Sequence, residues 1–144
     1  MKYKEYTTKI LSVLTILFLT FLISSCAKKI VFQPSVIVPA ATGKVKIKKD
    51  GNNNYSINLS VQNLADADRL TPPQNVYIVW IMTKESGVKN IGQIKSSSGL
   101  FSGKMKASLQ AVSPFKPTRV FITAERNNDI LYPGSQEVLT TRSF

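Results

Sequence analysis

The chain has 144 residues, with 19 Lys or Arg against 8 Asp or Glu, no histidine and one cysteine. This length suits one domain, and a hydrophobic fraction of 43% is ordinary for a folded protein. Without histidine the chain can form neither a Ser-His nor a Cys-His nucleophile, nor a zinc site of the common His/Cys kind. One cysteine cannot close a disulfide within the chain.

The first 25 residues have the three parts of a secretory signal peptide. Lys2, Lys4 and Lys9 precede an apolar run of 14 residues from Ile10 to Ile23, which is shorter than the roughly 20 residues of a membrane-spanning helix. Small residues follow this run. Because this order of charged, apolar and small segments is typical of exported proteins, we predict that residues 1–25 are removed.

The segment Ile23-Ser24-Ser25-Cys26 resembles the lipobox of bacterial lipoproteins. The resemblance implies that the signal is cut before Cys26, that the Cys26 thiol receives a diacylglyceryl group, and that the new amino terminus is acylated too. Two or more acyl chains anchor a protein stably, since each buried methylene contributes about 0.8 kcal/mol. The alternative is a secreted or membrane-anchored protein in which the cysteine is coincidental.

The residues after Cys26 suggest where such a lipoprotein resides in the bacterial cell envelope. Ala27 in place of an aspartate resembles lipoproteins that are sorted to the outer membrane instead of the inner one. Lys28 and Lys29 differ from the acidic signals that send some lipoproteins to the cell surface. The expected location is therefore the outer membrane, facing the periplasm.

Removal of residues 1–25 leaves 16 basic and 7 acidic residues, a net charge of +9. Such a charge is also found in nucleic-acid-binding domains, but an exported chain does not normally meet nucleic acid, so we expect no partner of that class. Anionic lipid headgroups and polyanionic envelope glycans are nearer, and solubility alone is the alternative explanation.

The mature chain is expected to begin with a lipidated amino terminus and a tether over residues 26–42, in which residues 35–38 add an edge strand. A β-sandwich domain is then expected over residues 43–144. Its first hairpin pairs two alternating runs, 44–48 and 55–61, across a turn at 50–54 that is rich in Asn. The apolar positions of both runs are expected to face the core: Val45, Ile47, Tyr55, Ile57, Leu59 and Val61.

The run Val76–Thr83 is the centre of the predicted fold, because its first seven residues are all apolar or aromatic and indicate a strand covered on both faces. Trp80 is expected to be a core residue whose indole N–H finds a nearby acceptor. Asn63–Asn75 is the longest irregular connection, held by Leu64 and Leu70. Further strands are expected over residues 88–95, 100–109, 119–125 and 137–141, with turns at 96–99, 113–117, 126–129 and 132–134.

These elements predict an all-β protein. About seven short strands at regular turn spacings, and no helical period after Cys26, are typical of a single immunoglobulin-like antiparallel β-sandwich. About 100 residues suffice for one such core without disulfides.

Several short segments of this domain resemble the C-terminal, extracytoplasmic domain of anti-sigma-K factors over roughly Gly43 to Thr141. They are Val76–Trp80, Gly87, Ile91-Gly92, Phe121–Glu125 and Pro133-Gly134. The resemblance implies a small β-sandwich on the outer side of a membrane. The cytoplasmic helical domain that grips the sigma factor and the spanning helix are missing, and a lipoprotein signal stands in their place. Sigma-factor inhibition therefore does not carry over, and no sigma factor is expected as partner.

Lys44, Lys46 and Lys48 share one face of a strand, and Lys104 and Lys106 repeat this pattern on another. We expect the first three to contact a membrane surface, since each lysine near an anionic surface contributes about 1 kcal/mol. The alternative is that these lysines guard an edge strand against pairing with a neighbouring molecule.

Candidate catalytic or metal-binding residues are few. Asp66 and Asp68 lie together, but their loop lacks the further oxygens of a calcium site. Glu125 and Asp129 flank one turn as a possible acid/base pair, although turn capping by Asp129 is the simpler explanation. Two S-x-x-K spacings, at Ser86 and Ser113, lie on a turn and across a proline instead of on a helix.

These observations predict a lipid-anchored envelope protein with a non-catalytic β-sandwich binding module. It is expected to have no enzyme activity, cofactor or metal, to contact the membrane through the lipid on Cys26, and to bind an envelope protein or glycan. One alternative is a structural accessory subunit of an envelope complex. The other is a glycan-acting enzyme that uses Glu125 and Asp129.

Overall fold

The computed structural model describes Tyr6 and residues 27–95, 97–98 and 105–144, so Cys26 and Lys104 lie outside the described residues, as does the predicted signal peptide apart from Tyr6. No helix in the described ranges combines the length and the hydrophobicity needed to cross a bilayer. The elements are β1 (Lys28–Val31), β2 (Thr42–Lys49), β3 (Tyr55–Gln62), the 3-10 helix η1 (Ala67–Arg69), β4 (Val76–Thr83), β5 (Gly87–Ile94), β6 (Ser97–Ser98), β7 (Met105–Ser113), β8 (Pro117–Glu125) and β9 (Glu137–Thr140).

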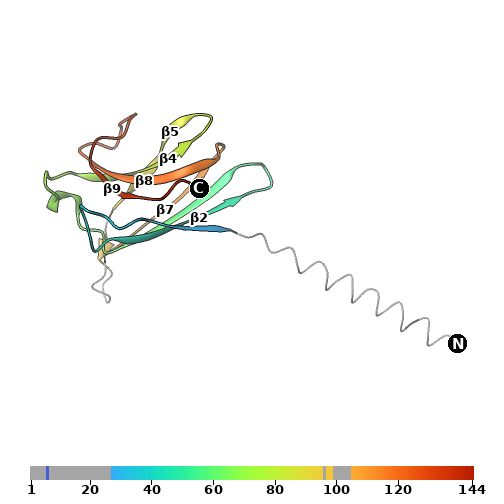
Figure 1. Cartoon of the computed structure of the whole chain (residues 1–144), viewed down its shortest axis with the longest axis horizontal. Helices are drawn as coiled ribbons and strands as arrows, with labels where there is room; N and C mark the ends of the chain where they lie inside the picture. The colour runs from blue at the N-terminus through green and yellow to red at the C-terminus, as the bar shows by residue number, and fades with distance from the viewer. Residues whose placement is uncertain (1–5, 7–26, 96, 99–104) are drawn as a thin grey trace.

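The strands form two antiparallel sheets packed face to face (Figure 1). One sheet has the order β1-β2-β3-β7-β6 and the other the order β5-β4-β8-β9. If β2 is strand A of an immunoglobulin fold, these orders are A-B-E-D and C′-C-F-G, with β1 added beside A. The predicted fold class is therefore confirmed. Two short strands, β1 and β6, raise the number of strands above the predicted seven.

The sandwich has two distinct ends. β1 begins at the proximal end, on the right in Figure 1, where the chain also turns between β2 and β3, between β4 and β5, and between β7 and β8. The opposite, distal end carries η1 and the loop between β8 and β9. The first strand therefore begins at the end opposite to η1 and the β8–β9 loop.

The core between the sheets is formed by the alternating apolar residues of β2 and β3 together with β4, β8 and β9. Leu64 and Leu70 are buried and hold the long β3–β4 connection, as predicted. β4 is covered on both faces, because Tyr77 and Val79 face the other sheet while Trp80 belongs to a second apolar cluster on the outer side. This arrangement confirms that Val76–Thr83 is the central strand.

The prediction of a tether over residues 26–42 is wrong, because the sandwich begins at Lys28 instead of at residue 43. Lys28–Val31 pairs with residues 44–47 of β2, and the expected strand over residues 35–38 is a turn. There the Ser35 hydroxyl oxygen accepts hydrogen bonds from the backbone N–H groups of Ile37 (3.2 Å) and Val38 (2.9 Å). Such local bonds compete with strand pairing.

Phe32 joins the two sheets directly after β1. Its backbone N–H donates to the Gly43 carbonyl oxygen at 3.1 Å, and Phe32 forms an isolated bridge with Thr141, just beyond β9. Its side chain is buried over Gly43, where an added Cβ atom would lie only 2.8 Å from the Phe32 ring. The segment after Cys26 is thus an integral part of the fold.

The predicted turn at residues 96–99 also differs from the structure. Ser97 and Ser98 form β6, which pairs with Lys106 and Met105 of β7. The predicted strand over residues 100–109 lies partly outside the described residues, and its described part continues to Ser113. The break expected at residues 113–117 lies between β7 and β8, as predicted.

Candidate functional site

The three predicted lysines lie where their alternation places them. Lys44, Lys46 and Lys48 are exposed on the outer face of the five-stranded sheet, and Val45 and Ile47 between them are buried. β2 is not an edge strand, however, because β1 pairs with one side of it and β3 with the other. The edge-guarding alternative is therefore wrong for the part of β2 that β1 covers, and the edge of this sheet is β1.

We name the outward-facing residues of β1, β2, β3 and β7 the lysine face. Besides lysines it presents Ser, Thr, Asn and Gln side chains and two valines, Val31 and Val112. Its lysines are Lys29, Lys44, Lys46, Lys48 and Lys106. The sequence did not point to Lys29 and Val31, since β1 was expected to be tether; the only signal is the short apolar stretch Ile30-Val31-Phe32 beside them.

The lysine face carries no Asp or Glu among the residues that the structure describes. Asp50, in the β2–β3 turn beside it, accepts hydrogen bonds from the backbone N–H groups of Asn52 and Asn54, both at 2.9 Å. The other acidic residues of the described chain lie in the β4–β5 turn, near η1 or around the β8–β9 loop: Glu85, Asp66, Asp68, Glu125, Asp129 and Glu137. The described residues of the lysine face therefore carry positive charge without a carboxylate among them.

A shallow depression of about 220 Å³ lies on the lysine face where β1, β2 and β3 meet. Lys29 and Lys44 line it together with the hydroxyl group of Ser60 and the amide of Gln62. Such a set of ammonium, hydroxyl and amide groups donates hydrogen bonds, as an anionic oxygen requires.

A larger pocket of about 480 Å³ lies at the distal end and is lined by residues that include Gln74, Glu125, Arg126 and Gln136. Its carboxylate is already engaged, because Glu125 accepts a hydrogen bond from the backbone N–H of Gly134 at 2.7 Å. Asp129 is not among the lining residues. The two carboxylates of the predicted acid/base pair therefore do not face each other across this pocket.

The other predicted candidates have structural roles. In the described ranges no three His, Cys, Asp or Glu residues come together as a metal site would require. Asp66 and Asp68 lie near Tyr77, and burial together with these two negative charges raises the pKa of Tyr77 to about 12. The Tyr77 hydroxyl donates to the Ala65 carbonyl oxygen at 2.9 Å. Ser113 exchanges hydrogen bonds with the backbone of Phe115, so this S-x-x-K copy forms a turn.

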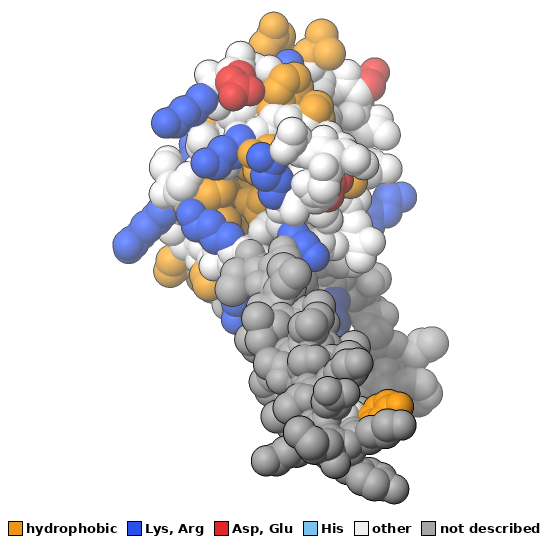
Figure 2. All heavy atoms as spheres, turned by 90° about the vertical axis from the view of Figure 1, so that its right-hand side faces the viewer, with side chains coloured by type: hydrophobic (Ala, Val, Ile, Leu, Met, Phe, Trp, Pro, Cys, Tyr) orange, Lys and Arg blue, Asp and Glu red, His pale blue; other side chains and the backbone are white. Residues whose placement is uncertain are grey.

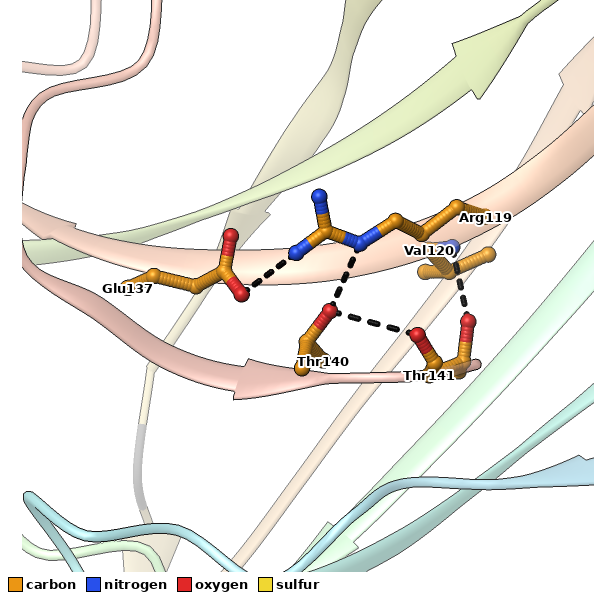
Figure 3. Close-up of polar contacts among 5 residues, drawn as sticks. All are labelled: Arg119, Val120, Glu137, Thr140 and Thr141. Carbon is orange, nitrogen blue, oxygen red and sulfur yellow. Dashed lines mark hydrogen bonds and ion pairs between the residues drawn. The ribbon is translucent and has the colours of Figure 1, made fainter. Parts of the chain in front are cut away.

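Trp80 and Arg119 are also occupied within the fold. Trp80 is fully buried and its indole N–H donates to the Thr123 hydroxyl oxygen at 2.8 Å, as predicted. Arg119 donates to Glu137 at 2.6 Å and to the Thr140 hydroxyl oxygen at 2.8 Å (Figure 3). Since the guanidinium group ties β8 to β9, it is a structural cation and not a free anion-binding group.

In comparisons with known proteins, no family model, curated protein or solved structure matches the chain. Two features of the chain therefore bear on its function. One is the lysine face, and the other is the position of β1, which begins two residues after Cys26.

Proposed function

We propose that this chain is a lipid-anchored protein of the bacterial envelope whose β-sandwich is a non-catalytic binding module. The observation that carries the proposal is the start of β1 at Lys28, which leaves only Ala27 between the lipobox cysteine and the first paired strand. Each extended residue spans at most about 3.6 Å, so the two steps from Cys26 to Lys28 would keep the first strand within roughly 7 Å of the acylated cysteine backbone.

A binding role agrees with the polar groups of the sandwich. No described side-chain N or O atom is buried without a hydrogen-bond partner, and the residues with catalytic potential hold turns or strands together. Lys29, Lys44, Lys46 and Lys48 of the lysine face are exposed, so their ammonium groups can contact a partner. The likeness to the extracytoplasmic domain of anti-sigma-K factors supports the same role, without the part that binds a sigma factor.

A structural accessory subunit is the second candidate, and one observation favours it. Leu131 and Tyr132, adjacent in the β8–β9 loop, are 81% and 80% exposed. Tyrosine is enriched at protein–protein interfaces. In this function the loop would dock the anchored domain onto a larger envelope complex.

The Cys26→Ser variant of the full chain tests the anchor. If the cysteine is acylated, the variant accumulates as an unprocessed precursor, takes up no labelled palmitate, and no longer sediments with outer membranes. Palmitate incorporation and membrane fractionation measure these effects, and Ser25→Ala, which keeps a small residue before the cysteine, is the matched control. A Cys26→Ser variant that labels and matures like the original chain contradicts the proposal. Recovery of the original chain with inner membranes contradicts only the sorting.

A further inference from the structure

We propose that the lysine face is the docking surface for anionic phospholipid headgroups, so that the anchored sandwich lies flat on the bilayer instead of standing on its proximal end. This inference rests on the proposed function, because it concerns the membrane to which Cys26 would attach the chain. It extends the predicted contact from one strand to the face of four strands.

The lysines of this face repel one another. Lys29 and Lys46 are direct cross-strand partners, and Lys44 and Lys48 lie two positions from Lys46 on the same strand. Like charges at opposite positions of a sheet destabilise it, and no described carboxylate on this face offsets them. An anionic surface would supply the missing opposite charge to all four ammonium groups at once.

The extent and composition of the face suit a contact with lipid headgroups. Four strands and four rows of residues cover about 14 Å by 20 Å, given strand spacings of about 4.8 Å and a rise of about 3.4 Å per residue. Val31 and Val112 lie on this face and are 63% and 65% exposed. The serine and amide side chains between the lysines donate hydrogen bonds, so the face combines charge, donors and apolar contacts that suit the headgroup region.

The position of the anchor favours the same orientation. β1 belongs to the sheet that carries the lysine face, and Lys29 is the third residue after Cys26. The proximal end is the other surface near the anchor, and Figure 2, which faces that side of the molecule, shows Lys and Arg side chains on it as well. That end, however, includes the carboxylates of Asp50 and Glu85 in its turns, which would meet the same negative headgroups.

Vesicle binding of the mature chain, residues 26–144 with Cys26→Ser, separates the two surfaces. This chain contains every strand of the sandwich. It is expected to bind vesicles of phosphatidylglycerol and phosphatidylcholine at low salt and to dissociate near about 0.15 M salt, where the Debye length is about 8 Å. Vesicles of phosphatidylcholine alone should not bind it.

The matched variants remove three positive charges from each surface. The triple change Lys44→Ser, Lys46→Ser and Lys48→Ser should weaken binding about a hundredfold, which corresponds to about 1 kcal/mol per lysine. The triple change Lys84→Ser, Lys89→Ser and Lys116→Ser, at exposed positions toward the proximal end, should weaken it far less. An equal loss in both variants, or a greater loss in the second, overturns the proposal. Binding to soluble polyphosphate without binding to the anionic vesicles overturns it too.

A second measurement reads the orientation of the lipidated full chain and does not depend on the triple variants. Since Cys26 is the only cysteine and would be acylated, one introduced cysteine provides the sole free thiol. In anionic vesicles Val112→Cys should react several-fold more slowly with a membrane-impermeant maleimide than in phosphatidylcholine vesicles, and Tyr132→Cys in the β8–β9 loop should be unaffected. Equal rates for Val112→Cys in both vesicles overturn the flat orientation. Failure of the proposed function instead appears as absent palmitate, whatever the vesicle binding shows.

Discussion

At the scale of single residues, Trp80 shows why the central strand needs cover on both sides. The Trp80 ring stacks on Phe121 with ring centroids 6.4 Å apart, and the Arg119 guanidinium lies 4.9 Å from the centre of the Phe121 ring. Ile130 of the β8–β9 loop packs against the same cluster. The outer side of β4 is therefore a small core of its own, closed by a loop.

Replacing Trp80 should destabilise the protein strongly. Trp80→Ala removes a fully buried ring and leaves the Thr123 hydroxyl without its donor, so the free energy of unfolding should fall by about 3–5 kcal/mol. Trp80→Phe keeps most of the apolar contact and should cost less. Urea denaturation followed by circular dichroism measures both changes. A loss below about 1 kcal/mol for the alanine variant would mean that the indole is not a core residue.

Tyr77 gives the fold a dependence on alkaline pH. Burial, with Asp66 and Asp68 nearby, raises the pKa of Tyr77 to about 12, whereas an unfolded tyrosine titrates near about 10. The folded state therefore binds the Tyr77 proton more tightly than the unfolded state does. The contribution of protonated Tyr77 to folding stability is fully present below about pH 10 and is lost as the pH rises towards about 12. Tyr77→Phe has no proton to lose. Between about pH 9 and pH 11.5 the parent should lose roughly 2 kcal/mol more stability than Tyr77→Phe. Parallel losses in the two proteins would contradict this.

At the scale of elements, β1 is the main difference between prediction and structure. β4 and the β2–β3 hairpin were predictable, because their apolar patterns and the Asn-rich turn, where Asn53 has a φ of 64°, are local signals. β1 is short, and it forms a strand because of residues later in the chain. β2 pairs with it, and Gly43 leaves space for the Phe32 side chain that follows it. Three lysines of the candidate site were predictable from strand alternation, but their neighbour Lys29 was not.

A chain that starts at Gly43 should be much less stable than one that starts at Ala27. The shorter chain lacks β1 and the buried side chains of Phe32, Val38 and Ala41, and it leaves one edge of β2 unpaired. Since the loss of a buried Phe alone costs about 3–5 kcal/mol and small domains have about 5–15 kcal/mol in total, the shorter chain should be marginal or unfolded. Phe32→Ala in the longer chain should account for part of the loss. Equal urea midpoints for the two chains would show that β1 is dispensable.

At the scale of the whole molecule, the two sheets present different surfaces. The lysine face is polar and positive, while the outer side of the other sheet carries the Trp80 cluster, the Arg119–Glu137 ion pair and the β8–β9 loop. With the lysine face against a bilayer, Leu131 and Tyr132 of that loop would remain exposed to the periplasm. The flat orientation and the accessory-subunit function are therefore compatible.

The direct connection between Cys26 and β1 also determines how the protein responds to mechanical force. The hydrogen bonds between antiparallel strands run perpendicular to the strands. Tension applied along β1 at its first residue would therefore load all of its hydrogen bonds to β2 in shear at the same time. The bonds that follow, from Phe32 to Gly43 and from Gln33 to Thr140, would carry load into both sheets. If Cys26 carries a lipid, a pull on that lipid would reach β1 through Ala27 alone, and the link could not lengthen until strand pairing at the edge of the sandwich broke.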